Sequence, residues 1–373
     1  MKIAILTSGI LPVPAVKGGA VENLIDFYLE YNDQHRLHDI TVYSVADKAT
    51  AHHPALQSAV NHYYYINVSS IMARLRKHIF HKLHADDEYY HYSIEYFLHK
   101  AIQHIRHQHY DLLLLENRPG YALQLRKYAN TPLIYHLHNE KLTCNTDSYL
   151  EIYEAATRII TVSDYIKSCV QSINPQDNKT LTVYNGINLQ AFSSGNGKNR
   201  RAEIGLDDDD FVMVFSGRVT EEKAIMQLLE AMLQLQDLPK IKLLVIGSSF
   251  YGNADNENAF AKTLREKAAT LAGRILFTGF IPYHQMPGYL LVADIAVIPS
   301  VWDDPFPTTV LEAQAMGLPI IATNRGGIPE EVGTDNAILL HTDNHFLQNL
   351  ATSIRDLYHT PEKRKAMRKA AIK

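Results

Sequence analysis

Short apolar runs alternate with amphipathic stretches from one end of the chain to the other. Apolar runs predict buried strands, and apolar positions three and four residues apart predict the helices between them. In the first half, strands are expected at residues 2–6, 39–45, 63–68, 111–115, 133–137, 158–162 and 181–184, and helices after residue 19 and at 70–109, 119–128 and 164–172. In the second half, strands are expected at residues 211–215, 241–246, 275–278, 294–298 and 319–322, and helices at 221–236, 257–271, 283–292 and 309–316. This alternation is typical of α/β proteins with doubly wound parallel sheets.

The alternation is interrupted at residues 193–210, where a polar stretch rich in glycine, serine and asparagine leads into four aspartates. We expect this stretch to connect two domains, since 373 residues exceed what one hydrophobic core usually supports. The sequence therefore predicts Rossmann-like domains at 1–192 and 193–355 and a final helix at 356–373. The two sheets are expected to face a central cleft in which a ligand binds.

Composition argues against several classes of function. The formal charge is −4 with histidine neutral, so nothing favours a nucleic-acid partner. Two cysteines, Cys144 and Cys169, are too few for a disulfide framework, and no apolar run reaches the roughly 20 residues of a membrane-spanning helix. The chain begins with a predicted strand rather than a signal peptide, so a cytoplasmic location is expected.

No metal site and no cofactor are expected. The 19 histidines are scattered without a metal-binding spacing such as HExxH. Aspartate runs at 86–87 and 207–210 lie in polar surroundings, where solvated carboxylates are common.

An acidic, proline-rich loop at residues 302–309 lies between a predicted strand and a predicted helix. Ligands of open α/β sheets bind beyond the carboxyl ends of strands, and the start of a helix suits phosphate. Asp304 and Glu312 bracket this helix start. Alternatively, Thr309 and Glu312 form only a capping box, in which the carboxylate binds backbone N–H groups.

Two further loops carry candidate ligand-binding residues. Residues 7–19 lack the G-x-G-x-x-G spacing of a dinucleotide site but end in Gly18 and Gly19, which let a ligand approach the backbone. A merely flexible loop is the alternative. The loop after residue 216 contains Arg218 and Lys223, which can hold a diphosphate without a metal ion. Alternatively, these two cations only form salt bridges with the neighbouring glutamates.

Six segments in chain order resemble retaining glycosyltransferases of family four, which have the GT-B fold. Residues 304–313 (D-P-F-P-T-T-V-L-E-A) are similar to the E-x7-E signature of that family. The other five segments are Gly18-Gly19, Val183-Tyr184-Asn185-Gly186-Ile187, Gly217-Arg218-x4-Lys223, Phe277-Thr278-Gly279-Phe280-Ile281 and Gly326-Gly327-Ile328-Pro329-Glu330.

The resemblance implies a role for each matching residue. Glu312 would bind the ribose hydroxyls of a nucleoside-diphosphate sugar, and Asp304 the hydroxyls of the transferred sugar. Arg218 and Lys223 would neutralise the diphosphate, and His138 would lie near the reacting sugar. The donor-binding positions implied are Gly18, Gly19, Gly217, Gly247, Ile281, Phe306, Pro307, Thr308 and Thr309. His136 is expected on the other side of its strand from His138, in a structural role.

Three features depart from the family pattern. Asp304 replaces the usual glutamate, so its sugar contact is expected to shift. Pro307 has no N–H where glycine is usual, so a backbone bond to the sugar is expected to be missing. The chain stops at Lys373 inside a predicted helix, where family members continue into a helix that returns to the first domain. A C-terminal truncation is the corresponding expectation.

The expected activity is retaining transfer of a hexose-type sugar from a nucleotide sugar, with UDP favoured over dTDP. The expected acceptor is a glycan or lipid-linked molecule in cell-surface polysaccharide synthesis. A basic run with apolar residues at helical spacing, residues 71–84, suits contact with an anionic membrane, and an ordinary surface helix is the alternative. The rival functions are a sugar-nucleotide epimerase or hydrolase of this fold and a non-catalytic subunit, which would lack the charged positions kept here.

Overall fold

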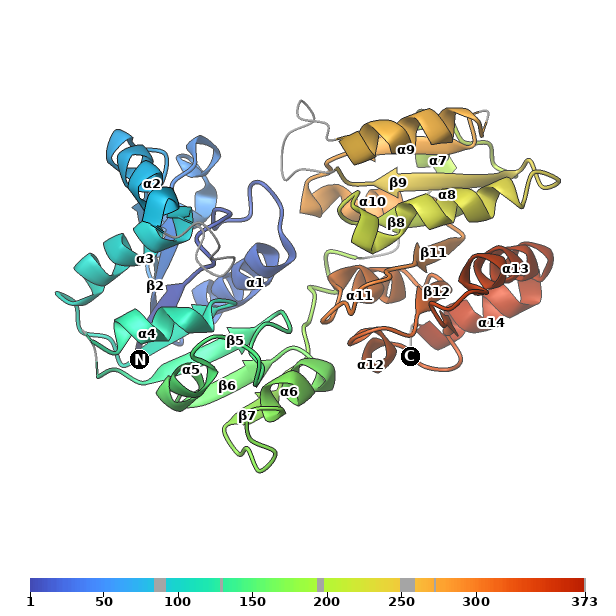
Figure 1. The fold of residues 1–373 in the computed structure, drawn as a ribbon. Helices are drawn as coiled ribbons and strands as arrows, with labels where there is room; N and C mark the ends of the chain where they lie inside the picture. The colour runs from blue at the N-terminus through green and yellow to red at the C-terminus, as the bar shows by residue number, and fades with distance from the viewer. Residues whose placement is uncertain (84–91, 128–129, 193–197, 249–258, 272, 372–373) are drawn as a thin grey trace. The chain divides into compact units, whose positions relative to one another are not determined.

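The computed structural model describes residues 1–373 except 84–91, 128–129, 193–197, 249–258, 272 and 372–373 (Figure 1). Contacts divide the chain into two compact units, Met1–Asn185 and Gly186–Lys373. The division precedes the expected boundary at residue 192, because Ile187 and Phe192 pack in the hydrophobic core of the second unit. The aspartate pair at 86–87 lies outside the described residues.

The first unit is built on a seven-stranded parallel sheet with the order β3-β2-β1-β4-β5-β6-β7. Its strands are β1 Lys2–Leu6, β2 Asp39–Val45, β3 Asn61–Ile66, β4 Leu112–Glu116, β5 Leu133–Leu137, β6 Arg158–Thr161 and β7 Thr180–Thr182. Its α-helices are α1 Ala20–His35, α2 Ile71–Leu83, α3 Tyr92–Ile105, α4 Ala122–Leu125, α5 Tyr149–Ala155 and α6 Asp164–Gln171. Short 3-10 helices lie at η1 Lys48–Thr50, η2 Pro54–Gln57 and η3 Pro119–Tyr121.

The second unit is built on a six-stranded parallel sheet with the order β10-β9-β8-β11-β12-β13. Its strands are β8 Phe211–Ser216, β9 Ile241–Ile246, β10 Ile275–Gly279, β11 Ile295–Ile298, β12 Ile320–Thr323 and β13 Ala337–Leu340. Its helices are α7 Lys198–Glu203, η4 Glu221–Lys223, α8 Ile225–Leu233, α9 Ala259–Ala269, η5 Tyr283–Gln285, α10 Met286–Leu290, α11 Thr308–Ala315, α12 Ile328–Glu331, α13 Phe346–His359 and α14 Pro361–Ala371.

Alternate residues of the central strands enter two separate hydrophobic cores in the second unit. Met213 of β8 belongs to the same core as Leu228 of α8, whereas the next residue, Val214, belongs to the same core as Val310 of α11. Successive side chains of a strand point to opposite faces, so helices cover both faces of this sheet (Figure 1). Two Rossmann-like units with parallel sheets are therefore confirmed.

Several expected helices differ in detail. The helix expected at 221–236 is interrupted at Ala224, whose φ of +53° is left-handed. The helix expected at 119–128 begins as a 3-10 turn at Pro119, and the one expected at 70–109 is two helices, α2 and α3. Strand β13 was not predicted, because a four-residue apolar run can belong to a helix or a strand. No helix in the described ranges has the length and apolar character needed to cross a bilayer.

Candidate functional site

Each sheet contains a point at which the strand order reverses, and the candidate residues follow the strands at these points. The reversal lies between β1 and β4 in the first unit and between β8 and β11 in the second. Loops leave such neighbouring strands in opposite directions, which makes room for a ligand at the carboxyl edge of the sheet. Both units therefore have the topology of a ligand-binding sheet edge.

The loop after β11 is held in place by main-chain contacts. The N–H group of Val301 donates to the carbonyl oxygen of Glu222 over 3.0 Å, and that of Gly327 donates to the carbonyl oxygen of Asp304 over 2.7 Å. Gly326 has a φ of +56°, and a Cβ there would lie 2.3 Å from the same Asp304 oxygen. A side chain does not fit at this position. Gly326 and Gly327 thus have a structural role: they contact the main chain of Asp304 and hold it in place.

Lys223 and Asp304 are brought together from positions 81 residues apart. The Lys223 ammonium forms an ion pair with the Asp304 carboxylate, and the two side chains are 18% and 7% exposed. The ammonium also lies 5.6 Å from the centroid of the Trp302 ring. A cation and a hydrogen-bond acceptor therefore stand preassembled beyond the ends of β8 and β11.

Arg218 lies in the loop after β8 and pairs with a neighbouring glutamate. Its guanidinium is 3.0 Å from the carboxylate of Glu222, and both side chains are 42% exposed. The salt-bridge alternative is thus realised for Arg218, with Glu222 as the partner. Exposed ion pairs of this kind contribute only about 0–1 kcal/mol to stability. Breaking the pair with Glu222 so that Arg218 can bind an anionic ligand would therefore cost little free energy.

Glu312 is buried inside α11 rather than engaged in a cap. This helix begins at Thr308 with Pro307 as its N-cap residue and without a capping side chain, so the capping-box alternative was wrong. The carboxyl group is 4% exposed. Burial raises the pKa of Glu312 to about 7, although hydrogen bonds from the Thr308 and Tyr283 side chains act in the opposite direction. Its oxygens can accept further hydrogen bonds from ligand hydroxyls.

The other predicted donor-binding residues of α11 surround its first turn. Thr308 and Thr309 are its first residues, where N–H groups have no carbonyl partner within the helix. Pro307 supplies no N–H, as expected. Phe306 is buried beneath the loop.

The ends of β8, β9 and β10 approach so closely that a side chain is excluded. The N–H group of Gly247 donates to the carbonyl oxygen of Gly279 over 2.9 Å. A Cβ on Gly247 would lie 1.9 Å from the carbonyl oxygen of Gly217, and the φ of Gly247 is +132°. Ile281 follows β10 and packs against the core on this edge. The structure thus gathers Gly217, Gly247 and Ile281 at the carboxyl edge of one sheet.

In the first unit, Gly18 and Gly19 lead into α1 with φ of +75° and +105°. A Cβ on Gly19 would lie 2.2 Å from Oε2 of Glu22, so Gly19 leaves space for this carboxyl group. Glu22 is 5% exposed. Burial raises the pKa of Glu22 to about 7. The negative charge of Glu116 also raises this pKa, whereas a hydrogen bond from the backbone N–H group of Glu22 lowers it. Sequence reasoning missed both of these carboxyl groups.

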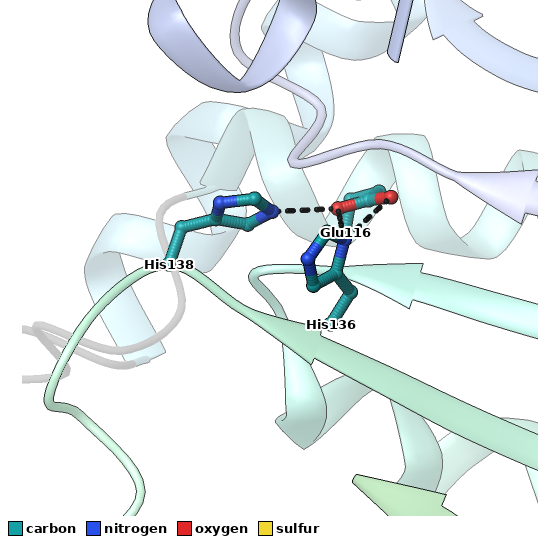
Figure 2. Close-up of side chains that lie close together, drawn as sticks. All are labelled: Glu116, His136 and His138. Atoms are coloured by element: carbon teal, nitrogen blue, oxygen red, sulfur yellow. Dashed lines mark hydrogen bonds and ion pairs between the residues drawn. The ribbon is translucent and has the colours of Figure 1, made fainter. Parts of the chain in front are cut away.

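Glu116, His136 and His138 form a buried cluster at the ends of β4 and β5 (Figure 2). Nε2 of His138 lies 3.0 Å from Oε2 of Glu116, and Nδ1 of His136 lies 3.2 Å from the same oxygen. The hydroxyl of Tyr28, from α1, donates to Oε1 of Glu116. The expectation that His136 points away from His138 was wrong, because residues two apart in a strand share a face.

The charges of this cluster are unequal. Burial alone would raise the pKa of Glu116, but its contacts with His136 and His138 outweigh burial and hold the pKa well below its usual range. Burial lowers the pKa of His138. In His136 the charge of Glu116 outweighs burial and raises the pKa. The cluster thus contains an ionised carboxylate, a histidine that favours the cation and a histidine that favours the neutral ring.

Two groups in the described part of the chain have side chains of the metal-binding type. The ligand atoms of Glu116, His136 and His138 lie within 4.8 Å of one another, as do those of Asp207, Asp209 and Asp210. In the first group both ring nitrogens face a carboxylate oxygen, which already explains the short distances. In the second, Asp209 pairs with Lys240 at 2.8 Å. Contrary to the expectation of a wholly solvated run, Asp210 is buried, and it accepts from the N–H group of Asp207.

Known proteins resemble this chain in sequence and in fold. The model of the family "Glycosyl transferases group 1" matches residues 197–373. Spore coat protein SA of Bacillus subtilis is 30% identical over 386 residues, covering 99% of this chain and 93% of that protein. An uncharacterized glycosyltransferase of Methanocaldococcus jannaschii, MJ1607, is 34% identical over 187 residues, covering 49% of this chain and 46% of that protein. The crystal structure of Anabaena HepE in complex with UDP and glucose has a TM-score of 0.75 at 22% identity and covers 100% of this chain and 93% of its own. The chain therefore belongs to the group 1 glycosyltransferases and has their GT-B fold of two Rossmann-like domains.

Proposed function

We propose that the protein transfers a hexose-type sugar, with retention of anomeric configuration, from a UDP-sugar to a glycan or lipid-linked acceptor of the cell surface. The observation that carries the proposal is the preassembled Lys223–Asp304 pair, in which Asp304 belongs to the loop that leads into α11. The UDP and glucose named for HepE support the choice of donor. The name of Spore coat protein SA supports a role at the cell surface.

In this proposal, the second unit supplies the groups that bind the donor. Lys223 and Arg218 neutralise the diphosphate as the bond between sugar and phosphate breaks, and the N–H groups of Thr308 and Thr309 add to this. Glu312 accepts hydrogen bonds from the ribose and Asp304 from the transferred sugar. Fixed charges of this kind let the diphosphate leave without a metal ion. The acceptor oxygen bonds to the anomeric carbon on the face from which the diphosphate departs, the bond from that carbon to the phosphate oxygen breaks, and the hydroxyl proton passes to the departing phosphate.

Nucleotide release from a panel of UDP- and dTDP-sugars tests the proposal. We expect UDP release to rise strongly when a glycan or lipid-linked acceptor is supplied, and the product to keep the anomeric configuration of the donor by NMR. Equal release without an acceptor would identify a hydrolase instead. Sugar interconversion without release would identify an epimerase, and no turnover with any donor would favour a non-catalytic subunit.

We further propose that α2 brings the enzyme to an anionic membrane surface that carries a lipid-linked acceptor. Ile71, Met72, Leu75 and Ile79 are 86%, 60%, 58% and 51% exposed, whereas Ala73 is buried. Arg74 and Arg76, both exposed, lie on either side of these apolar residues, and the helix carries two more exposed cations, Lys77 and Lys82. An apolar stripe between cations is the pattern of a helix that lies in a lipid interface.

Sedimentation with phosphatidylglycerol vesicles tests this surface. Near an anionic bilayer each basic residue contributes about 1 kcal/mol, so replacing Arg74 and Arg76 by alanine is expected to weaken binding about 30-fold. Arg368→Ala/Lys369→Ala is the matched control, because it removes two exposed cations from α14, which lies in the other unit. Equal binding of wild type to neutral phosphatidylcholine vesicles, or of the double variant to anionic ones, would contradict the membrane contact.

A further inference from the structure

Glu116 is the buried centre of a hydrogen-bond network that no motif predicted. The residue is 0% exposed, and donors from two elements converge on its carboxylate. Tyr28 reaches Oε1 from α1, and His136 and His138 reach Oε2 from β5 and the residues after it (Figure 2). An ionised carboxylate without such partners would cost several kcal/mol to bury. The network is therefore complete around Glu116 and holds each partner in one orientation.

The chemistry of the carboxylate decides which ring nitrogen of each histidine carries a proton. An ionised carboxylate has only acceptor sites. The nitrogens that face it, Nε2 of His138 at 3.0 Å and Nδ1 of His136 at 3.2 Å, must therefore be N–H donors. For His138, donation through Nε2 leaves Nδ1 as the nitrogen that carries a lone pair whenever the ring is neutral.

The second histidine makes a neutral His138 favourable. The charge of Glu116 is already balanced when His136 is protonated, and the two rings lie only 4.2 Å apart. A second cation at that distance is unfavourable. The main chain of His138 is also fixed, because its N–H group donates to Oδ1 of Asn117 over 3.1 Å. Ring and backbone are thus both held by residues at the end of β4.

From this network we infer that Glu116 is a positioning residue, which presents His138 to a sugar as a neutral ring whose Nδ1 accepts a hydrogen bond from a hydroxyl group. The inference rests on the proposed function and on the place of His138 near the reacting sugar, which the resemblance to family-four glycosyltransferases implies. It adds the kind of ligand group that His138 binds. A nitrogen lone pair attracts a hydroxyl hydrogen and repels a phosphate oxygen, so His138 binds sugar rather than diphosphate.

The test compares the kinetic constants of four variants. With Glu116→Gln, the ring of His138 loses its anionic partner, and we expect kcat to fall about 10²-fold with the KM for the donor nearly unchanged, as misplacing one contacting group does. His138→Gln should lower kcat at least as much, and the double variant no further than His138→Gln alone. Tyr153→Phe is the matched control, because it removes a tyrosine hydroxyl that donates to a carboxylate, that of Asp177, in the same unit but outside this network. It should lower the melting temperature while kcat stays at the wild-type value.

Histidine ¹⁵N NMR of the wild-type protein gives a readout that does not depend on variants folding. The His138 signals, assigned by their loss in His138→Gln, should report a proton on Nε2 and none on Nδ1. An Nδ1–H ring or an imidazolium at neutral pH would overturn the inference, as would equal losses of kcat in Tyr153→Phe and Glu116→Gln. If His138→Gln lowers kcat but Glu116→Gln does not, the inference fails and the proposed function stands. If His138→Gln turns over normally, His138 does not contact the reacting sugar and the inference fails, while the donor site proposed for the second unit stands.

Discussion

Replacing Lys223 by alanine is expected to lower kcat about 10²–10³-fold, the typical cost of losing one preorganised group that stabilises transition-state charge. In the proposed reaction the diphosphate gains negative charge as the sugar leaves, and Lys223 is the most buried cation of the loop after β8. The exposed Arg218 cannot replace it, because water screens its charge. The measurement is single-turnover release of UDP from the best donor of the panel.

A control is needed because Lys223→Ala leaves the carboxylate of Asp304 buried without its cation. The double variant Lys223→Ala/Asp304→Asn removes this unpaired charge, so its melting temperature should recover while its kcat stays low. Lys240→Ala is the matched surface variant, since Lys240 pairs with Asp209 in the same unit and belongs to none of the matching motifs. Turnover of Lys223→Ala within a few-fold of the Lys240→Ala value would remove Lys223 from the diphosphate site.

Glu312→Gln is expected to weaken donor binding about 10²-fold, because a charge-assisted hydrogen bond contributes about 1.5–3 kcal/mol. The substitution keeps the volume of a side chain that is 4% exposed, so packing should survive. The loss should appear in the KM for the nucleotide sugar and in calorimetric UDP binding. Unchanged UDP affinity in this variant would show that the ribose lies elsewhere.

The pKa of Glu312 adds a pH dependence with a defined sign. Burial raises this pKa from 4.5 to about 7, so the folded protein holds a proton that the unfolded chain has lost between these values. The stabilising contribution is therefore complete below pH 4.5 and is lost as pH rises through about 7. Ribose hydroxyls favour the ionised carboxylate, so UDP affinity should rise from pH 6 to pH 8. The difference between wild type and Glu312→Gln isolates this effect, because titration of the UDP phosphates is common to both. A wild-type affinity profile parallel to that of the variant would contradict it.

Local pattern was enough to predict most of the framework. The strands at 39–45, 133–137 and 241–246 have the expected bounds, because apolar residues dominate each of these short segments. Where a local signal was ambiguous, the prediction failed. The apolar periodicity of 221–236 continues through Ala224, but its left-handed backbone separates η4 from α8. Thr309 and Glu312 have capping-box spacing, but the helix starts one residue earlier.

The sequence by itself determined the α/β class and the motif positions that carry donor-binding residues, because strand periodicity and motif spacing are local properties. Tertiary structure alone decided which distant side chains meet. Lys223 reaches Asp304 because β8 pairs with β11, and Glu116 reaches both histidines because β4 pairs with β5. In the run L-L-L-L-E, a lone carboxylate at the end of a buried strand signals that a partner is needed. Only strand pairing identifies that partner, since hydrogen bonds between parallel strands join residues that are far apart in the chain.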